Sequence, residues 1–308
     1  MRYVVTGAAG FIGSQLGEAL QEAGHDVVGV DCFTDYYDPA VKERNARALD
    51  VRRLDLADDA LDLRGFDGVF HLAGQPGVRS FGSRFPLYVR QNVLASQRVF
   101  EAAAEAGTRV VFASSSSVYG EAARYPTAED VPLRPLSPYG ITKLTAEHLA
   151  RAYARSFELD AVVLRYFNAY GPRQRPDMAF PRVVEALVTG RPFTLFGDGE
   201  QSRSFTFVRD VVDATILAMA GAEAGTTYNV GGGQEATMNE AMATLERIAG
   251  RRLDVRREPA VPGDQRRTKA DTTRIRADLG WSPRTPLEEG LRAQWAWMVE
   301  SAAVESQP

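Results

Sequence analysis

Tyr139 and Lys143 stand four residues apart in a stretch that is predicted to be helical and that Ser137-Pro138 opens. Side chains at positions i and i+4 share one face of a helix, so these two groups can meet. A lysine ammonium beside a tyrosine hydroxyl favours the phenolate and lowers the pKa of the tyrosine. Such a tyrosine can serve as a general base near neutral pH. Because helices often carry this pair as a plain surface contact, the spacing alone is weak evidence.

Four consecutive serines, at positions 114–117, lie upstream of this pair and directly follow the apolar stretch 109–113. We predict that the stretch is a buried strand, and ligands bind at the carboxyl ends of parallel strands. A serine run can also be a plain linker, although linkers seldom follow an apolar strand directly. The run therefore strengthens the indication of a site around Tyr139.

The first residues carry a glycine pattern that is typical of dinucleotide binding. A predicted strand at 3–6 leads into Gly7, Gly10 and Gly13, and a helix follows. These glycines allow a tight turn and a close approach of the backbone to a pyrophosphate, which the helix N-terminus attracts. A glycine turn without any ligand is the alternative explanation of the pattern taken alone.

Acidic residues end the next two predicted strands. Asp31 follows Gly13 by 18 positions, which is close to the spacing expected for a ribose-binding carboxylate. A carboxylate there accepts hydrogen bonds from the ribose of NAD and repels the 2′-phosphate of NADP, so we expect NAD as the cofactor. Asp55 and Leu56 either contact adenine or form an ordinary turn at the end of a strand.

The elements that must position these groups alternate along the chain. Predicted strands at 3–6, 26–30, 68–72, 109–113 and 161–165 are separated by helical patterns that include 12–23, 91–106 and 139–157. This alternation predicts an α/β fold with a doubly wound parallel sheet of the Rossmann type. After about residue 166, proline and glycine cluster and the regular alternation of strands and helices ends. We therefore predict an NAD-binding domain at 1–165, with returns near 204–230 by the strand-like stretches 205–208 and 227–230. A smaller C-terminal α/β lobe should occupy 166–308.

Composition excludes several classes of protein. The chain has 308 residues, 44% hydrophobic and 25% charged, with a net charge of −4, which does not favour a nucleic-acid surface. Cys32 is the single cysteine, so no disulfide framework or zinc cluster can form within one chain, and no metal site is expected. No apolar run is long enough to cross a bilayer, and the N-terminus lacks a signal-peptide pattern. We expect a cytoplasmic protein.

Taken together, these motifs resemble the extended short-chain dehydrogenase/reductase family of NAD-dependent nucleotide-sugar enzymes. The resemblance covers nearly the whole chain and extends beyond the glycine turn, the serine run and the Tyr139/Lys143 pair. Further segments that match the family begin at His71, Val118, Arg165, Tyr170, Phe196, Asn229 and Leu279. It implies a Rossmann domain, a smaller nucleotide-sugar lobe and tightly held NAD. It also implies a homodimer built on a four-helix bundle, for which helices 91–106 and 139–157 are the candidates.

The resemblance assigns roles to residues in matching positions. Tyr139 would take the proton from the C4 hydroxyl of the sugar, Lys143 would hold the nicotinamide ribose and lower the pKa of the tyrosine, and Ser115 would assist. The implied cofactor-binding residues are Gly7, Gly10, Phe11, Ile12, Gly13, Asp31, Asp55, Leu56, Leu72, Ala73, Gly74, Asn92, Ser114, Tyr139, Lys143 and Tyr166. The implied substrate contacts are Arg79, Ser115, Ser116, Ser117, Asn168, Arg175, Thr194, Phe196, Arg203 and Asp264.

The two residues before Val118 separate the reactions of this family. The 4,6-dehydratases place an Asp-Glu pair there, and the decarboxylases that form xylose place a glutamate directly before the valine. Ser116 and Ser117 provide no carboxylic acid, so elimination lacks its matched acid–base pair. Epimerisation at C4 needs no such pair, because the 4-keto sugar turns over and takes the hydride back on its other face.

The segments at 74–79 and 175–179 are similar to UDP-glucuronate 4-epimerases, and Arg79, Arg175 and the serines suit a C6 carboxylate. We therefore predict the conversion of UDP-glucuronate to UDP-galacturonate. UDP-glucose 4-epimerase is the alternative, because Asn168 is more like that group, whereas Val261 favours the glucuronate enzymes. A UDP-glucuronate decarboxylase and an NAD-binding scaffold without activity are further alternatives. The presence of both Tyr139 and Lys143 argues against the scaffold.

Overall fold

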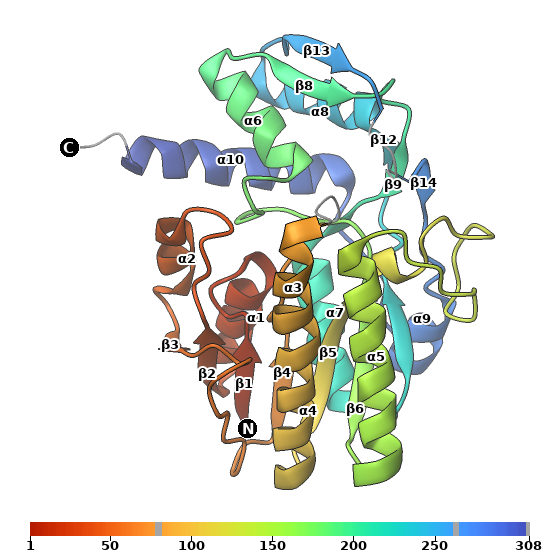
Figure 1. The fold of residues 1–308 in the computed structure, drawn as a ribbon. Helices are drawn as coiled ribbons and strands as arrows, with labels where there is room; N and C mark the ends of the chain where they lie inside the picture. The colour runs from red at the N-terminus through yellow and green to blue at the C-terminus, as the bar shows by residue number, and fades with distance from the viewer. Residues whose placement is uncertain (78–81, 261–264, 306–308) are drawn as a thin grey trace.

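A parallel sheet of seven strands organises the computed structural model, which describes residues 1–77, 82–260 and 265–305. The strands run in the order β11-β6-β5-β4-β1-β2-β3, and every pairing between neighbours is parallel (Figure 1). Their bounds are β1 Arg2–Thr6, β2 Asp26–Asp31, β3 Asp50–Arg53, β4 Gly68–His71, β5 Arg109–Ser115, β6 Ala161–Tyr166 and β11 Thr227–Val230. The predicted doubly wound α/β fold is confirmed.

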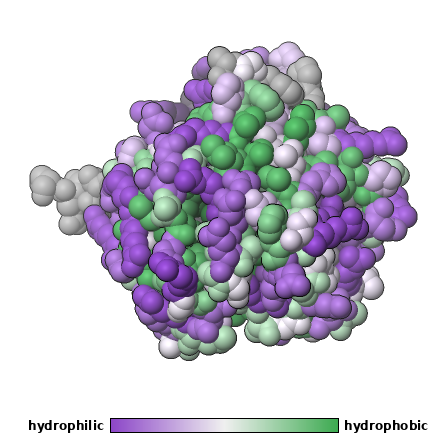
Figure 2. Space-filling model, turned by 60° about the horizontal axis from the view of Figure 1, so that its bottom comes forward, coloured by the Kyte–Doolittle hydropathy of each residue, from purple (hydrophilic) through white to green (hydrophobic). Residues whose placement is uncertain are grey.

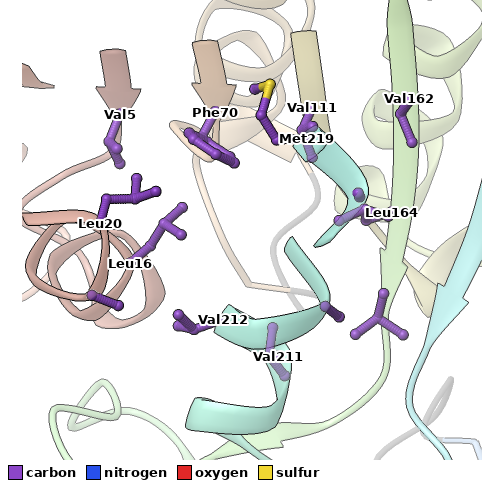
Figure 3. Packing of buried hydrophobic residues seen from close by; sticks show 14 of the residues in the cluster. Val5, Leu16, Leu20, Phe70, Val111, Val162, Leu164, Val211, Val212 and Met219 are labelled. Atoms are coloured by element: carbon purple, nitrogen blue, oxygen red, sulfur yellow. The ribbon is translucent and has the colours of Figure 1, made fainter. Parts of the chain in front are cut away.

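Helices cover both faces of this sheet because the strands are apolar on both sides. On one face, α1 (Phe11–Glu22) and α7 (Val208–Gly221) pack against side chains such as Val5 and Phe70 (Figure 3). On the other face, α4 (Ala95–Ala106) and α5 (Pro138–Phe157) bury neighbouring strand residues, which include Val4 and Val69. Successive residues of β1 thus point into different cores, as the pleat requires.

The two helices on that second face begin in different ways. Ser137 caps α5 by accepting a hydrogen bond from the backbone N–H of Gly140 at 3.0 Å, and Pro138 occupies the first turn. The predicted helix 91–106 is composite, because a π-helical segment, η2 (Val89–Leu94), precedes α4. A π-helical turn inserts an extra residue and is frequent at functional sites.

A smaller lobe lies above the carboxyl ends of the strands, and α10 (Leu287–Glu305) runs between it and the sheet domain (Figure 1). Its core joins α6, α8 and β8 through residues such as Val183, Leu195 and Leu245. The lobe contains α6 Ala179–Thr189, α8 Met238–Ala249, β8 Phe193–Phe196, β9 Ser202–Ser204, β12 Glu235–Thr237, β13 Val255–Glu258 and β14 Arg267–Thr268. The remaining short elements are α2 Pro39–Ala46, η1 Gly82–Arg84, α3 Phe85–Tyr88, η3 Ser116–Val118, β7 Ala169–Tyr170, β10 Thr206–Phe207 and α9 Thr273–Leu279.

The two stretches that were predicted to return to the first sheet behave differently. Residues 227–230 do return, as the edge strand β11 beside β6. Residues 205–208 do not, because Thr206 and Phe207 pair with β7 in a separate two-stranded sheet and Val208 already begins α7. The apolar character of this stretch comes from Phe205 and Phe207, which pack in the core of the smaller lobe, and from Val208 at the start of α7. Among the described residues, no helix has both the length and the apolar composition that crossing a bilayer requires.

A buried ion pair fastens α5 to the sheet. Glu147 on α5 accepts hydrogen bonds from Arg165 on β6, at 3.0 Å from Nε and 2.7 Å from Nη2, and both side chains are almost completely excluded from solvent. Arg165 also donates to the hydroxyl of Tyr119 at 2.8 Å, and that hydroxyl donates to Asn229 on β11 at 2.7 Å. Glu147 accepts a further hydrogen bond from Ser114 at 2.6 Å. The network therefore joins α5, β5, β6 and β11.

Replacing Arg165 with Met should lower the free energy of unfolding by about 3–5 kcal/mol, because it leaves the buried carboxylate of Glu147 without its main partner. Urea denaturation of the nucleotide-free protein measures the change. Arg209→Met is the matched control, since Arg209 pairs with Asp213 on the solvent-exposed side of α7 and should change stability little. Equal effects of the two substitutions would contradict this account of the pair.

Candidate functional site

The glycine turn between β1 and α1 brings two backbone segments unusually close together. Gly7 has φ +70°, and a Cβ there would lie 2.8 Å from the backbone nitrogen of Ala73. A Cβ on Gly13 would collide with the carbonyl oxygen of Gly7. Gly10 is the N-cap of α1 and supplies no side-chain cap, so the first N–H groups of the helix are directed toward the cavity. This arrangement fits a pyrophosphate.

Asp31, the last residue of β2, also lines this cavity. Its carboxylate accepts hydrogen bonds from the backbone N–H of Phe33 at 2.8 Å and of Ala9 at 3.1 Å. Lys42 lies nearby and donates to the carbonyl and hydroxyl oxygens of Thr34, both at 2.8 Å. The side chain of Lys42 is buried, and this desolvation lowers its pKa while the charge of Asp31 opposes the change. The sequence analysis did not identify Lys42, because no motif marks it.

Most of the expected cofactor residues line this first cavity. Those that do are Gly7, Gly10, Phe11, Ile12, Gly13, Asp31, Leu56, Leu72, Ala73, Gly74, Ser114, Tyr139, Lys143 and Tyr166. The cavity also includes residues that the sequence reasoning missed, among them Cys32, Thr34, Tyr36, Tyr37, Lys42, Gln75, Pro76 and Gln91.

Asp55 and Asn92 do not line the cavity, and both are occupied elsewhere. Asp55 forms an ion pair with Arg90 at 2.8 Å. Asn92, in the π-helical segment, accepts a hydrogen bond from the backbone N–H of Gln75 at 2.6 Å and donates to its carbonyl at 3.1 Å. Asn92 therefore fixes the loop that contributes Gln75 to the cavity wall.

A second cavity adjoins the first and extends into the smaller lobe. The residues that line both are Phe11, Ile12, Tyr36, Pro76, Ser114, Tyr139, Tyr166 and Arg175. Expected substrate residues that line the second cavity are Ser115, Ser116, Ser117, Asn168, Arg175, Thr194, Phe196 and Arg203. Arg182, Gln201 and Gln265 also line it and had no signal in the sequence. Arg79 and Asp264, which were also expected there, and Val261 lie outside the described residues.

Two of these residues also support the wall of the second cavity. Asn168 has φ +41° and donates from Nδ2 to the hydroxyl of Thr268 at 2.7 Å and to the carbonyl of Ser204 at 3.3 Å. Arg203 donates from Nη1 to the carbonyl of Ser202 at 2.9 Å. Asn168 therefore links β9 to β14, Arg203 contacts its own strand β9, and both residues line the cavity.

Tyr139 lines both cavities and so lies at their junction. Burial raises the pKa of Tyr139, whereas the charge of Arg175 and a hydrogen bond with Ser115 lower it. The Nζ of Lys143 is 6.0 Å from the centre of the Tyr139 ring and donates to the carbonyl of Ala113 at 2.8 Å. Burial lowers the pKa of Lys143 to about 8, and the neighbouring carboxylate of Glu147 opposes that change.

A Rossmann sheet with a glycine turn, a carboxylate after β2 and a Tyr/Lys pair on α5 defines an enzyme of the short-chain dehydrogenase/reductase class. A family model described as the NAD dependent epimerase/dehydratase family matches residues 3–231. The chain belongs to this family, and NAD is its cofactor.

Individual relatives cover almost the whole chain. The uncharacterized UDP-glucose epimerase YtcB of Bacillus subtilis is 41% identical over 97% of this chain and 98% of its own length. The crystal structure of UDP-glucuronic acid 4-epimerase from Bacillus cereus in complex with UDP-glucuronic acid and NAD is 38% identical, with a TM-score of 0.94, and covers 98% of this chain and 100% of that one. MoeE5 in complex with UDP-glucuronic acid and NAD is 43% identical, with a TM-score of 0.88 and the same coverage.

Replacing Arg175 with Ala should raise the pKa of Tyr139, because it removes the positive charge that favours the phenolate. The phenolate should then form only at higher pH than in the unmodified protein. Ultraviolet difference titration of the nucleotide-free protein, with Tyr139→Phe as the blank, measures this ionisation. Lys143→Met should raise the pKa of Tyr139 by less than Arg175→Ala does. A larger rise in Lys143→Met would mean that Lys143 is the main group that stabilises the phenolate.

Proposed function

We propose that the protein interconverts UDP-glucuronate and UDP-galacturonate by epimerisation at C4. The observation that carries this proposal is the placement of Tyr139 and Ser115 where a dinucleotide cavity meets a second cavity that contains Arg175 and three serines. Within the described residues, the only acid lining the second cavity is Asp177, and it is paired with Arg175. The described lining of the cavity thus offers donors for an anionic sugar and, among its residues, no unpaired carboxylate for elimination.

NAD fits the first cavity in charge and in shape. The open N-terminus of α1 would hold its pyrophosphate, Asp31 would accept from its adenosine ribose, and Lys143 would donate to its nicotinamide ribose. When bound, NAD accepts a hydride from C4 of the sugar and returns it. Asp31 would face the 2′-phosphate of NADP with like charge, although Lys42 lies in the same part of the cavity.

Tyr139 would act as the base that takes the proton of the C4 hydroxyl. Its hydrogen bond with Ser115 and the charge of Arg175 both stabilise the phenolate, which offsets part of the cost of burial. The same tyrosine would return the proton once the 4-keto sugar has rotated. A hydroxyl whose phenolate is stabilised by such neighbours suits reversible proton transfer.

The C6 carboxylate needs firm binding because a 4-keto sugar acid is a β-keto acid, which loses CO₂ readily. Arg175, Ser116 and Ser117 would donate to the carboxylate, with Arg79 as a further candidate. Such donors stabilise the charged carboxylate relative to neutral CO₂. This arrangement favours epimerisation over decarboxylation.

The smaller lobe would bind the UDP part of the substrate. Phe196 would stack on uracil beside Thr194, Asn168 and Arg203 would contact the diphosphate, and Asp264 would accept from the ribose. We assign residues 1–165 together with β11 and α7 to the NAD-binding domain, and most of 166–308 to this lobe.

UDP-glucose 4-epimerase is the second candidate function. Asn168 favours it, and so does the similarity to YtcB. UDP-glucose has no carboxylate. If UDP-glucose were the substrate, the donors of Arg175 that Asp177 leaves available would meet no anionic group of the sugar. That difference makes UDP-glucuronate the preferred assignment.

We further propose that the protein is a cytoplasmic homodimer that pairs through α4 and α5. Large apolar side chains are exposed along this side of the molecule, at Phe85, Leu87, Val89, Leu94, Ile141 and Phe157. Figure 2 shows hydrophobic side chains gathered among polar ones on the face turned to the viewer. Two copies of α4 and α5 would bury such residues in a four-helix bundle.

Light scattering at micromolar concentration should give the mass of two chains, because pairing would remove these apolar side chains from water. Leu94→Glu with Ile141→Glu should shift the mass toward one chain. Leu217→Glu, at an exposed apolar position on α7, is the matched control and should leave the mass unchanged. A single-chain mass for the unmodified protein would contradict the dimer.

Tyr139→Phe keeps the ring and removes only the ionisable oxygen. We expect the affinity for UDP-glucuronate to persist while kcat falls by at least roughly 10²–10⁴, as for a lost acid–base group. Calorimetry and a turnover assay measure the two quantities. Tyr153→Phe, farther along α5 and outside both cavities, should retain activity. Near-normal turnover of Tyr139→Phe would move the role of base to another residue.

Incubation with UDP-glucuronate should yield UDP-galacturonate with its carboxylate intact, as identified by NMR or mass spectrometry. Arg175→Ala should lower kcat/KM for UDP-glucuronate about tenfold more than for UDP-glucose, because only the former presents a charge to the guanidinium. Efficient conversion of UDP-glucose with UDP-glucuronate untouched would favour the second candidate. UDP-xylose or a 4-keto pentose as the main product would identify a decarboxylase.

A further inference from the structure

Arg175 does not stand alone in the cavity wall, because Asp177 holds it through two parallel hydrogen bonds. Nε of Arg175 lies 2.9 Å from Oδ1 of Asp177, and Nη2 lies 3.0 Å from Oδ2. A third residue, Tyr36, donates its hydroxyl to Oδ2 of Asp177 at 3.3 Å, and its ring centre is 5.8 Å from the guanidinium carbon. Two side chains therefore restrain the guanidinium.

These residues come from different parts of the molecule. Tyr36 belongs to the loop after β2, which also contributes Thr34 and Tyr37 to the dinucleotide cavity. Asp177 precedes α6 of the smaller lobe and lies 141 positions farther along the chain. Tyr36 and Arg175 each line both cavities. The contact thus connects the wall of the dinucleotide cavity to the wall of the second cavity.

The geometry leaves one edge of the guanidinium available. Asp177 occupies Nε and Nη2, whereas Nη1 makes no hydrogen bond within the part of the chain that the structure describes. A guanidinium is planar and donates in fixed directions, so holding one edge also fixes the direction of the other donors. The side chain of Arg175 is only 21% exposed, which further limits its rotation.

We propose that Asp177 and Tyr36 are positioning residues that hold Arg175 for the C6 carboxylate and so set the preference for an acidic sugar over a neutral one. The proposal rests on the proposed function, since it takes Arg175 as the group that meets the carboxylate. Asp177 acts by orienting the guanidinium, and Tyr36 acts by orienting Asp177. Neither residue needs to touch the substrate.

The test compares UDP-glucuronate with UDP-glucose in the holoenzyme. In Asp177→Asn, the ratio of kcat/KM for the two sugars should fall about tenfold, which corresponds to about 1.4 kcal/mol. The loss should appear mainly in KM for UDP-glucuronate. Tyr36→Phe, which removes only the hydroxyl, should lower the ratio in the same direction by less. In an Arg175→Ala background, Asp177→Asn should not change the ratio further.

Asp62→Asn is the matched control. Asp62 and Arg64 form the same bidentate pair two residues apart, with 2.9 Å from Nε and 2.6 Å from Nη2, on the exposed surface. This variant should leave both activities unchanged. Because it breaks an identical type of contact, it reports any general effect of losing a surface ion pair.

Three outcomes would overturn the proposal: a rise in the ratio, an equal loss for both sugars, or an effect of Asp177→Asn that persists without Arg175. A rise would mean that Asp177 competes with the sugar carboxylate. If Asp177→Asn does not fold, the ratio in Tyr36→Phe decides, and an unchanged ratio there refutes the role. Preference of the unmodified enzyme for UDP-glucose would refute the proposed function instead, and the change of the ratio in the variants would still report on positioning.

Discussion

The buried pairing of Glu147 with Arg165 is the interaction on which the arrangement of the site depends. It joins α5, which carries Tyr139 and Lys143, to β6, which leads into the segment that carries Asn168 and Arg175. Two charges can remain in such a dry interior only because each satisfies the other and Ser114 and Tyr119 satisfy further hydrogen-bonding groups. The same carboxylate opposes the loss of charge on Lys143, one helical turn away. Support of the fold and the electrostatics of the site therefore share one network.

The electrostatics of the two cavities depend on the residues that contact the lining side chains as much as on the lining side chains themselves. Arg175 favours the phenolate of Tyr139 and is itself held by Asp177, while Lys42 stands close to Asp31 at the far end of the dinucleotide cavity. Asp177 fixes the direction of Arg175, whereas the carbonyl and hydroxyl oxygens of Thr34 hold Lys42. Fixed donors cost less to reorganise when a ligand changes its charge during a reaction.

The parts of the structure that depend on local patterns could be predicted from the sequence. The turn at Gly7–Gly13, the strand that ends at Asp31 and the helix that Ser137 caps each have a short signature with a physical cause. Contacts between distant parts of the chain could not be predicted in this way. Asp55 pairs with Arg90, and Asn92 bonds to the backbone of Gln75, a residue of the cavity wall. Tyr36 and Asp177 meet across 141 positions, so no local motif could indicate their contact, although Asp177 lies in the segment 175–179 that the resemblance included.

The position of β11 at the edge of the sheet has a consequence for the newly made chain. Residues 227–230 complete the sheet beside β6, yet α6, β8 and much of the smaller lobe precede them in the sequence. During synthesis from the N-terminus, β6 therefore leaves the ribosome with one side unpaired, and its apolar run Val162, Val163 and Leu164 has no neighbour there. An unpaired apolar edge is a template for strands of other chains. Until β11 emerges, this edge of the nascent sheet is therefore open to pairing with other chains.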